Sequence, residues 1–221
     1  MKKILILLSA VCLATGAANA QSLLLNGDFE TPQATGWIGT DWTSWAWGNG
    51  WSAHEIKNNI PGQMNGGNGT YLLNAGGMGW NGGGGAWQTV SANAGMQYTL
   101  TVDSGADAWW QPNGYMSMTF FDASNVDLGG ATRNTVDPAV YGGITDIPHP
   151  MLNYSLDAIA PVGTTAVKVE FSGNNLWGGS VTFDNGFLSM SAIPEPSTVA
   201  LFGLGAALLI VNRFRRGSNR A

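Results

Sequence analysis

The chain has 221 residues and a formal net charge of −5 at pH 7, with glycine (32 residues) and tryptophan (10 residues) both abundant. Residues 21–193 hold three basic residues against thirteen acidic ones, a formal charge of −10. Such a surface repels phosphate backbones and acidic lipid headgroups, which argues against nucleic-acid binding. Neutral glycans or cations are better suited to it.

The N-terminal residues have the pattern of a secretory signal peptide. Two lysines precede an apolar run at residues 4–17, and the small-x-small sequence Ala-Asn-Ala occupies residues 18–20. This order predicts export and cleavage before Gln21. Cys12, the one cysteine of the chain, lies in the segment to be removed. We therefore expect a mature protein without a disulfide, a thiol nucleophile or a cysteine metal site, stabilised by packing or by a bound ion.

Residues 21–192 are predicted to form one all-β domain. Apolar residues alternate with period two between glycine-rich connections, and no segment keeps the helical i, i+3, i+4, i+7 pattern for three turns. Half-buried strands of this kind predict two sheets packed face to face. The predicted strands are 70–73, 86–90, 97–102, 115–121, 154–159, 166–171 and 180–188.

Two segments between the predicted strands are interpreted as irregular. Residues 35–68 are expected to form long loops, and residues 76–85, which include Trp80, are too glycine-rich for regular structure. The glycines at 82–85 are not followed by the Lys-Ser/Thr of a phosphate-binding loop, so they predict a flexible connection.

Tryptophan is concentrated in the first of these segments, where five of the ten lie within fifteen residues among Gly, Asn, Ser and Thr. A flat aromatic ring beside hydroxyl and amide groups suits a pyranose, whose C–H face stacks on the ring. For any single tryptophan, packing a loop against the sandwich is the commoner role, but we expect at least one exposed ring. Trp87 alternates within a strand and is predicted to lie in the core. The candidate sugar-binding residues are Trp42, Trp45, Trp47, Trp80, Trp109 and Trp110.

The sequence shows no catalytic constellation. His54 and His149 lack a metal-binding spacing, and neither a Gly-x-Ser-x-Gly elbow nor the Glu-x-Asp-x-x-Glu strand motif of jelly-roll glucanases occurs. Glycoside hydrolysis needs two carboxylates roughly 5 to 10 Å apart. Any thirteen acidic residues offer some pair at that distance, so their presence neither supports nor excludes a glycoside hydrolase. We predict a non-catalytic protein and keep a glycan-active enzyme as the minor alternative.

Five short motifs follow one another through the domain. They are Asn26-Gly27-Asp28-Phe29-Glu30, Trp87-Gln88, Ala-Gly-Met-Gln-Tyr-Thr-Leu at 94–100, Ala-Pro-Val-Gly-Thr at 160–164 and Val-Thr-Phe-Asp-Asn at 181–185. Together they resemble the galactose-binding-like jelly roll of carbohydrate-binding modules. The resemblance implies a jelly-roll β-sandwich, and the inward positions would be Phe29, Tyr98, Leu100, Val169 and Phe183.

The same resemblance implies a structural calcium ion that ties the first strand to the last. The matching positions are Asp28 or Glu30 at one end and Asp184 at the other, and carboxylate oxygens are the ligands that Ca²⁺ prefers. The alternative is that these residues cap turns or face water.

Residues 193–221 combine three features in a fixed order. Pro194, Glu195 and Pro196 come first, an apolar run at 198–211 follows, and an arginine cluster closes the series (Arg213, Arg215, Arg216). Two prolines one residue apart keep the backbone extended and accessible to a processing enzyme. The apolar run gives about 21 Å of helix against a hydrocarbon core of about 30 Å, and the arginines predict a cytoplasmic tail.

This order of parts resembles the PEP-CTERM sorting signal. The resemblance implies a transmembrane helix, cleavage near the motif by an exosortase of a Gram-negative bacterium that makes extracellular polysaccharide, and a transient inner-membrane intermediate. The product would reach the cell surface, the outer membrane or the extracellular matrix. The predicted organisation is a signal peptide at 1–20, an ectodomain at 21–192 and a sorting signal at 193–221. We predict a protein that binds or organises extracellular polysaccharide, the alternative being a structural surface protein whose tryptophans only pack.

Overall fold

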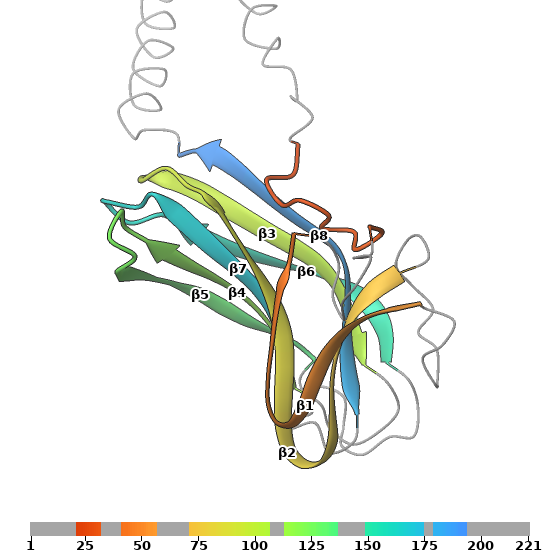
Figure 1. The fold of residues 1–221 in the computed structure, drawn as a ribbon. Helices are drawn as coiled ribbons and strands as arrows, with labels where there is room; N and C mark the ends of the chain where they lie inside the picture. Colours follow the sequence, from red (N-terminus) through yellow and green to blue (C-terminus); the bar gives the residue numbers. More distant parts are fainter. Residues whose placement is uncertain are drawn as a thin grey trace, which may run out of the picture. The chain divides into compact units, whose positions relative to one another are not determined.

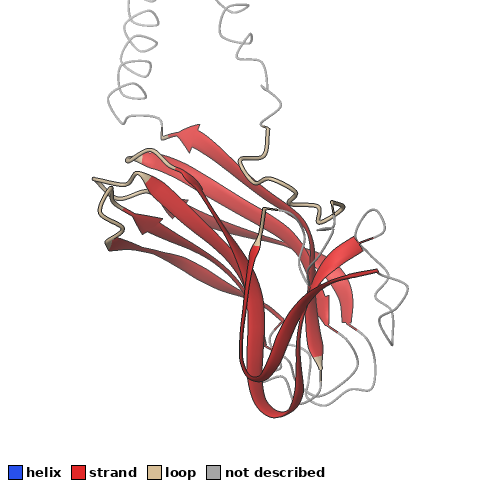
Figure 2. Cartoon of the chain, viewed as in Figure 1, coloured by secondary structure: helices blue, strands red, loops and turns tan. Residues whose placement is uncertain are grey.

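The computed structural model describes residues 21–31, 41–56, 71–106, 113–136, 149–174 and 179–193 (Figure 1). These ranges contain strands and their connections, as Figure 2 shows. The strands are β1 (Thr43–Ile56), β2 (Tyr71–Ser91), β3 (Met96–Ala106), β4 (Asn113–Phe121), β5 (Asp127–Val136), β6 (His149–Ile159), β7 (Ala166–Asn174) and β8 (Ser180–Ala192). The described ranges include no helix long and apolar enough to cross a membrane. The predicted signal peptide and the predicted span at 198–211 lie outside them.

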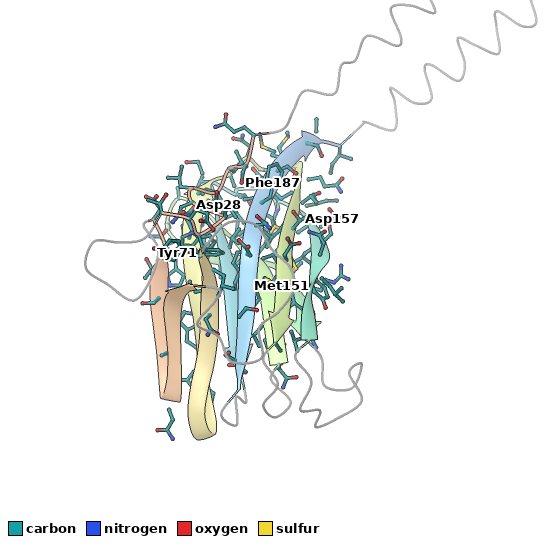
Figure 3. All side chains as sticks on the ribbon, turned by 90° about the vertical axis from the view of Figure 1, so that its right-hand side faces the viewer. Asp28, Tyr71, Met151, Asp157 and Phe187 are labelled. Carbon is teal, nitrogen blue, oxygen red and sulfur yellow. The ribbon has the colours of Figure 1, made fainter. Side chains whose placement is uncertain are left out.

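The strands form a sandwich of two antiparallel layers, which confirms the predicted jelly-roll class. The hydrogen-bonded order is β5-β4-β7-β2-β8-β3-β6, with β1 paired to β2. Residues Gly83–Ser91 of β2 pair with β7 in the first layer, whereas Leu73–Gly76 pair with β8 in the second. β2 therefore belongs to both layers. β6, which carries Met151 and Asp157, lies on the side away from β1 and β2 (Figure 3).

The glycine-rich run at 76–85 was predicted to be irregular, and that prediction is wrong because the run is the bend of β2. The pairs Gly48↔Gly82 and Gly50↔Gly77 flank a register shift, and both β1 and β2 turn sharply there (Figure 1). A Cβ on Gly50 would lie 2.0 Å from the Gly83 carbonyl oxygen. Only glycine allows the two backbones to approach so closely.

Two strands were not predicted. Residues 43–56, expected to be loops, form β1, whose alternation is hidden by its glycines and by Trp45 and Trp47, which are partly or largely exposed. β5 is an edge strand with the sequence Asp-Leu-Gly-Gly-Ala-Thr-Arg-Asn-Thr-Val, and its buried residues are confined to its last two positions. Each of the seven predicted strands overlaps an observed strand.

The core lies between the layers and is built from alternate residues of the central strands. Phe29, Tyr98, Leu100, Val169 and Phe183, the predicted inward positions, are all exposed by 1% or less. The further fully buried side chains include Met116, Met118, Phe120, Val167, Phe171 and Val181. Burial on this scale supplies most of the stability that a domain without cysteines requires.

Residues 21–31 close the gap that opens where β2 leaves β8. The Leu23 N–H donates to the Leu188 carbonyl (2.8 Å) and the Gly186 N–H to the Gly27 carbonyl (2.7 Å). On the other side of the segment, the Gln88 side chain accepts from the Leu25 N–H (2.8 Å) and donates to its carbonyl (3.0 Å). The segment therefore joins the two layers.

Candidate functional site

Four aromatic side chains share the outer face of the first layer. Directly opposed residues of antiparallel strands lie on the same face, and the register gives the rows Trp45–Gly85–Ser172–Tyr115 and Thr43–Trp87–Glu170–Ser117. Trp47 lies on the same face because it is two residues from Trp45 on β1. Trp45, Trp87 and Tyr115 are half-buried, whereas Trp47 is 44% exposed. We call Trp45, Trp47, Trp87 and Tyr115 the aromatic face.

Glycines of β2 make room for this arrangement. Gly83 lies between Trp47 on β1 and Asn174 on β7. A Cβ on Gly83 would lie 2.4 Å from Trp47 Nε1 and 2.5 Å from Asn174 Oδ1, so the indole and the amide both extend over this glycine. Gly85 likewise leaves no side chain between Trp45 and Ser172. The Trp47 indole and the Asn174 amide therefore cover the backbone of β2 at Gly83, which is buried.

Polar groups surround the four rings. Glu170 is opposite Trp87, and its Oε2 lies 3.0 Å from Nζ of Lys168 on the same strand. The side chains of Lys168 and Glu170 are 30% and 18% exposed, so the ion pair is accessible to a ligand. The neutral polar residues on this face include Thr43, Asn113, Ser117, Thr119, Thr132, Asn134 and Asn174. The site thus offers hydroxyls and amides with one internally compensated pair of charges.

The predicted sugar-binding tryptophans have different positions in the structure. Trp45 and Trp47 belong to the aromatic face, on a strand rather than in a loop. Trp42 is 4% exposed, its ring centroid lies 5.1 Å from that of Phe29, and its Nε1–H donates to the Asn26 carbonyl (3.0 Å). The prediction for Trp42 is therefore wrong, because this indole packs the core. The side chain of Trp80 and the whole of Trp109 and Trp110 lie outside the described residues.

The prediction that Trp87 lies in the core is also wrong. Its neighbours Ala86 and Gln88 point inward, and Trp87 is half-buried on the opposite face. Because the polar side chain of Gln88 points inward, the inward and outward positions in this part of β2 are the reverse of those predicted. Gln88 is satisfied there by the backbone of Leu25 and by the Asp41 carbonyl, which accepts from its Nε2 at 3.0 Å.

Besides Trp87, sequence reasoning did not identify Tyr115, Lys168 and Glu170 as residues of the site. Tyr115 precedes the inward residues Met116, Met118 and Phe120, so its outward position follows from strand alternation alone. Glu170 lies between the inward Val169 and Phe171 for the same reason. That the two strands lie side by side depends on the fold and had no signal in the sequence.

The proposed calcium ligands differ in their burial and in their hydrogen bonds. The Asp184 side chain is fully buried and accepts from the Asn185 N–H (2.8 Å), whereas Asp28 is exposed. Oε1 of Glu30 accepts from the Tyr71 N–H (3.0 Å), and Figure 3 labels Asp28 and Tyr71. Within the described ranges no three His, Cys, Asp or Glu side chains are grouped as metal ligands. The calcium hypothesis needs only one of Asp28 and Glu30 together with Asp184 and backbone carbonyls, and calcium binding stays a prediction.

Comparison with known families identifies the C-terminal segment. The family model of the PEP-CTERM protein-sorting motif matches residues 192–216. The chain carries a PEP-CTERM sorting signal. The protein is accordingly an exported one with a C-terminal sorting signal, and the PEP-CTERM motif implies processing by an exosortase.

Solved structures are similar to this chain over 77–83% of its length. The enzymatically active domain of tailspike protein 4 of bacteriophage CBA120 is 14% identical with a TM-score of 0.53, over 77% of this chain and 21% of that chain. An arabinose-bound GH51 α-L-arabinofuranosidase is 13% identical with a TM-score of 0.50, over 83% of this chain and 29% of that chain. The CBM22-1 xylan-binding domain from Paenibacillus barcinonensis is 13% identical with a TM-score of 0.48, over 80% of this chain and 99% of that chain.

At these identities the likeness concerns the fold alone, because one fold supports many functions. The chain spans less than a third of the tailspike domain and of the arabinofuranosidase that it matches. No curated protein sequence matches it.

Proposed function

We propose that the exported domain binds neutral extracellular polysaccharide through the aromatic face and catalyses no reaction. The observation that carries this proposal is the strand register, which gathers Trp45, Trp47, Trp87 and Tyr115 on one open face. The same proposal includes the destination of the protein. After exosortase cleavage the domain reaches the cell surface, the outer membrane or the matrix of a Gram-negative bacterium.

The chemistry of the aromatic face suits a chain of sugars. Aromatic rings offer an apolar surface to the C–H face of a pyranose, and side-chain amides and hydroxyls exchange hydrogen bonds with its hydroxyl groups. The carboxylate of Glu170 adds a charged acceptor, and hydrogen bonds to ionised groups are stronger than those between neutral groups. An open face of several strands gives room for more than one sugar unit.

The charges favour binding over catalysis. Glycoside hydrolysis needs two carboxylates about 5 to 10 Å apart, one as acid and one as base or nucleophile. Glu170 is held in an ion pair with Lys168 instead. The formal charge of −10 over residues 21–193 also disfavours acidic polysaccharides, since the negatively charged domain repels a negatively charged polysaccharide.

A structural surface protein is the second candidate, favoured by the burial of Trp42. In a glycan-binding protein the exposed rings contact sugar, whereas in a structural protein they do not.

We propose affinity electrophoresis of the processed protein in gels that contain neutral polysaccharides, comparing wild type with Trp47→Ala and Tyr115→Ala. The control is Leu152→Ala on β6, a residue 47% exposed and in the other layer.

Glycan binding predicts that wild type and the Leu152 variant are retarded in the gel and that the two aromatic variants are retarded less. If wild type migrates at the same rate with and without every polysaccharide, the domain is a structural protein and the glycan proposal is withdrawn.

A further inference from the structure

Three turns and the last part of β8 are joined at one end of the sandwich. The Ala92 N–H donates to the Thr165 carbonyl (2.9 Å), and the Thr165 N–H donates to the Phe121 carbonyl (2.8 Å). These bonds connect the turns β2–β3, β6–β7 and β4–β5. Met190 of β8 belongs to the same end because its sulfur accepts from the buried Tyr98 hydroxyl (3.2 Å) and from Asn93 Nδ2 (3.7 Å).

Large apolar side chains are exposed at this end. Val162 in the β6–β7 turn is 94% exposed, and Ile159, the last residue of β6, is 60% exposed. Val126, just before β5, is 54% exposed, and Met190 is 38% exposed. Gly163 of the β6–β7 turn lies near Leu128 of β5: a Cβ on this glycine would be 4.0 Å from Leu128 Cδ1. The turns that carry Val126 and Val162 are therefore neighbours, and we call Val126, Ile159, Val162 and Met190 the exit surface.

The sorting signal begins next to the exit surface along the chain. The family match starts at residue 192, and Pro194 is four residues after Met190. Four residues span at most about 14 Å when fully extended. An enzyme that acts at the motif is therefore brought within contact distance of this end of the domain. Exposed apolar side chains gathered at such a place are characteristic of a protein-interaction surface.

We propose that the exit surface docks onto the exosortase that processes the motif. The neighbouring charges favour a protein partner over a bare bilayer. Asp122 and Asp127 flank Val126, and their Oδ1 atoms accept backbone N–H groups of Ser124 (2.8 Å) and Gly129 (2.7 Å), which fixes both carboxylates in the turn. The surface potential of a membrane with anionic lipids repels such groups. The exosortase would thus recognise the folded domain together with the motif.

The test uses the full chain in a strain that carries the exosortase. Pulse-chase labelling measures how fast precursor is converted to processed protein for wild type, for Val126→Ser/Val162→Ser and for Val162→Ser alone. Leu152→Ser, an exposed apolar position away from this end, is the matched control. Resistance of each precursor to trypsin shows that the domain is folded, and the single variant at a 94% exposed position has little packing to lose.

We expect the double variant to be processed about fivefold more slowly, which corresponds to about 1 kcal/mol at 1.4 kcal/mol per tenfold. The control should be processed at the wild-type rate. Equal rates for wild type and the folded double variant would overturn the proposal. A lipid partner would also overturn it: wild type would then bind vesicles of phosphatidylethanolamine and phosphatidylglycerol, and the double variant would lose that binding in parallel with its processing rate.

Discussion

Replacing Trp42 and Trp47 with alanine, one at a time, separates packing from binding in a single pair of variants. The two indoles are five residues apart, yet Trp42 is 4% exposed and Trp47 is 44% exposed. The Trp42 ring packs against Phe29 and Phe171, with ring centroids 5.1 and 5.5 Å away, and donates a hydrogen bond to the Asn26 carbonyl. The account therefore predicts opposite phenotypes for the two variants.

Trp42→Ala removes a buried aromatic side chain and leaves a cavity, which costs about 3–5 kcal/mol. For a domain of this size each kcal/mol shifts the melting temperature by about 2–4 °C, so the midpoint should fall by roughly 6–20 °C. Trp47→Ala should change stability by only about 0.5 kcal/mol, as exposed substitutions do. It should instead weaken glycan binding about two- to twelvefold, since a lost aromatic contact costs about 0.5–1.5 kcal/mol.

The assay is thermal unfolding followed by circular dichroism, with glycan affinity measured on the same samples. Trp42→Phe keeps a ring against Phe29 but loses the bond to Asn26, so its melting temperature should lie between those of wild type and Trp42→Ala. The reasoning is refuted if Trp47→Ala melts as early as Trp42→Ala, because the exposed ring would then be a packing residue.

Further predictions concern the sorting signal, the ion and the bend. Replacing residues 194–196 with alanine should trap the precursor at the inner membrane. The intact mass of the processed wild type should correspond to a chain from Gln21 to near residue 194. Surface-exposed protein that still carries the arginine tail would contradict cleavage at the motif. The calcium hypothesis predicts that EDTA lowers the melting temperature, since Ca²⁺ at a hundredfold excess over its Kd stabilises the folded state by about 2.7 kcal/mol. An unchanged melting temperature after all metal has been removed rejects the hypothesis. Gly50→Ala should destabilise by about 1–3 kcal/mol or more in chemical unfolding, because its Cβ would meet the Gly83 carbonyl oxygen at 2.0 Å; wild-type stability would disprove the close approach.

The strands that alternate cleanly could be predicted from the sequence. In β7, Val167, Val169 and Phe171 occupy every second position and are all fully buried. β1 could not be predicted in this way, because it exists through its pairing with β2 and its own residues are mainly Trp, Gly, Ser and Ala. Strand preference of this kind depends on neighbours that are distant in the sequence.

The candidate site was only partly predictable for the same reason. The concentration of tryptophans pointed to Trp45 and Trp47, but burial of Trp42 depends on contacts with Phe29 and Phe171. The outward direction of Trp87 is set by hydrogen bonds between Gln88 and Leu25, which are 63 residues apart. Which strands carry the remaining rings and charges is decided by the strand order, and periodicity does not encode that order.

The most direct test of the glycan-binding account is oxidative footprinting of the processed protein with and without a bound neutral polysaccharide, read by mass spectrometry. The account predicts that the polysaccharide protects Trp45, Trp47, Trp87 and Tyr115 from hydroxyl radicals, while Trp42 is labelled weakly in both conditions. It would be contradicted if bound polysaccharide left the labelling of these four residues unchanged or protected the outer face of the second layer instead.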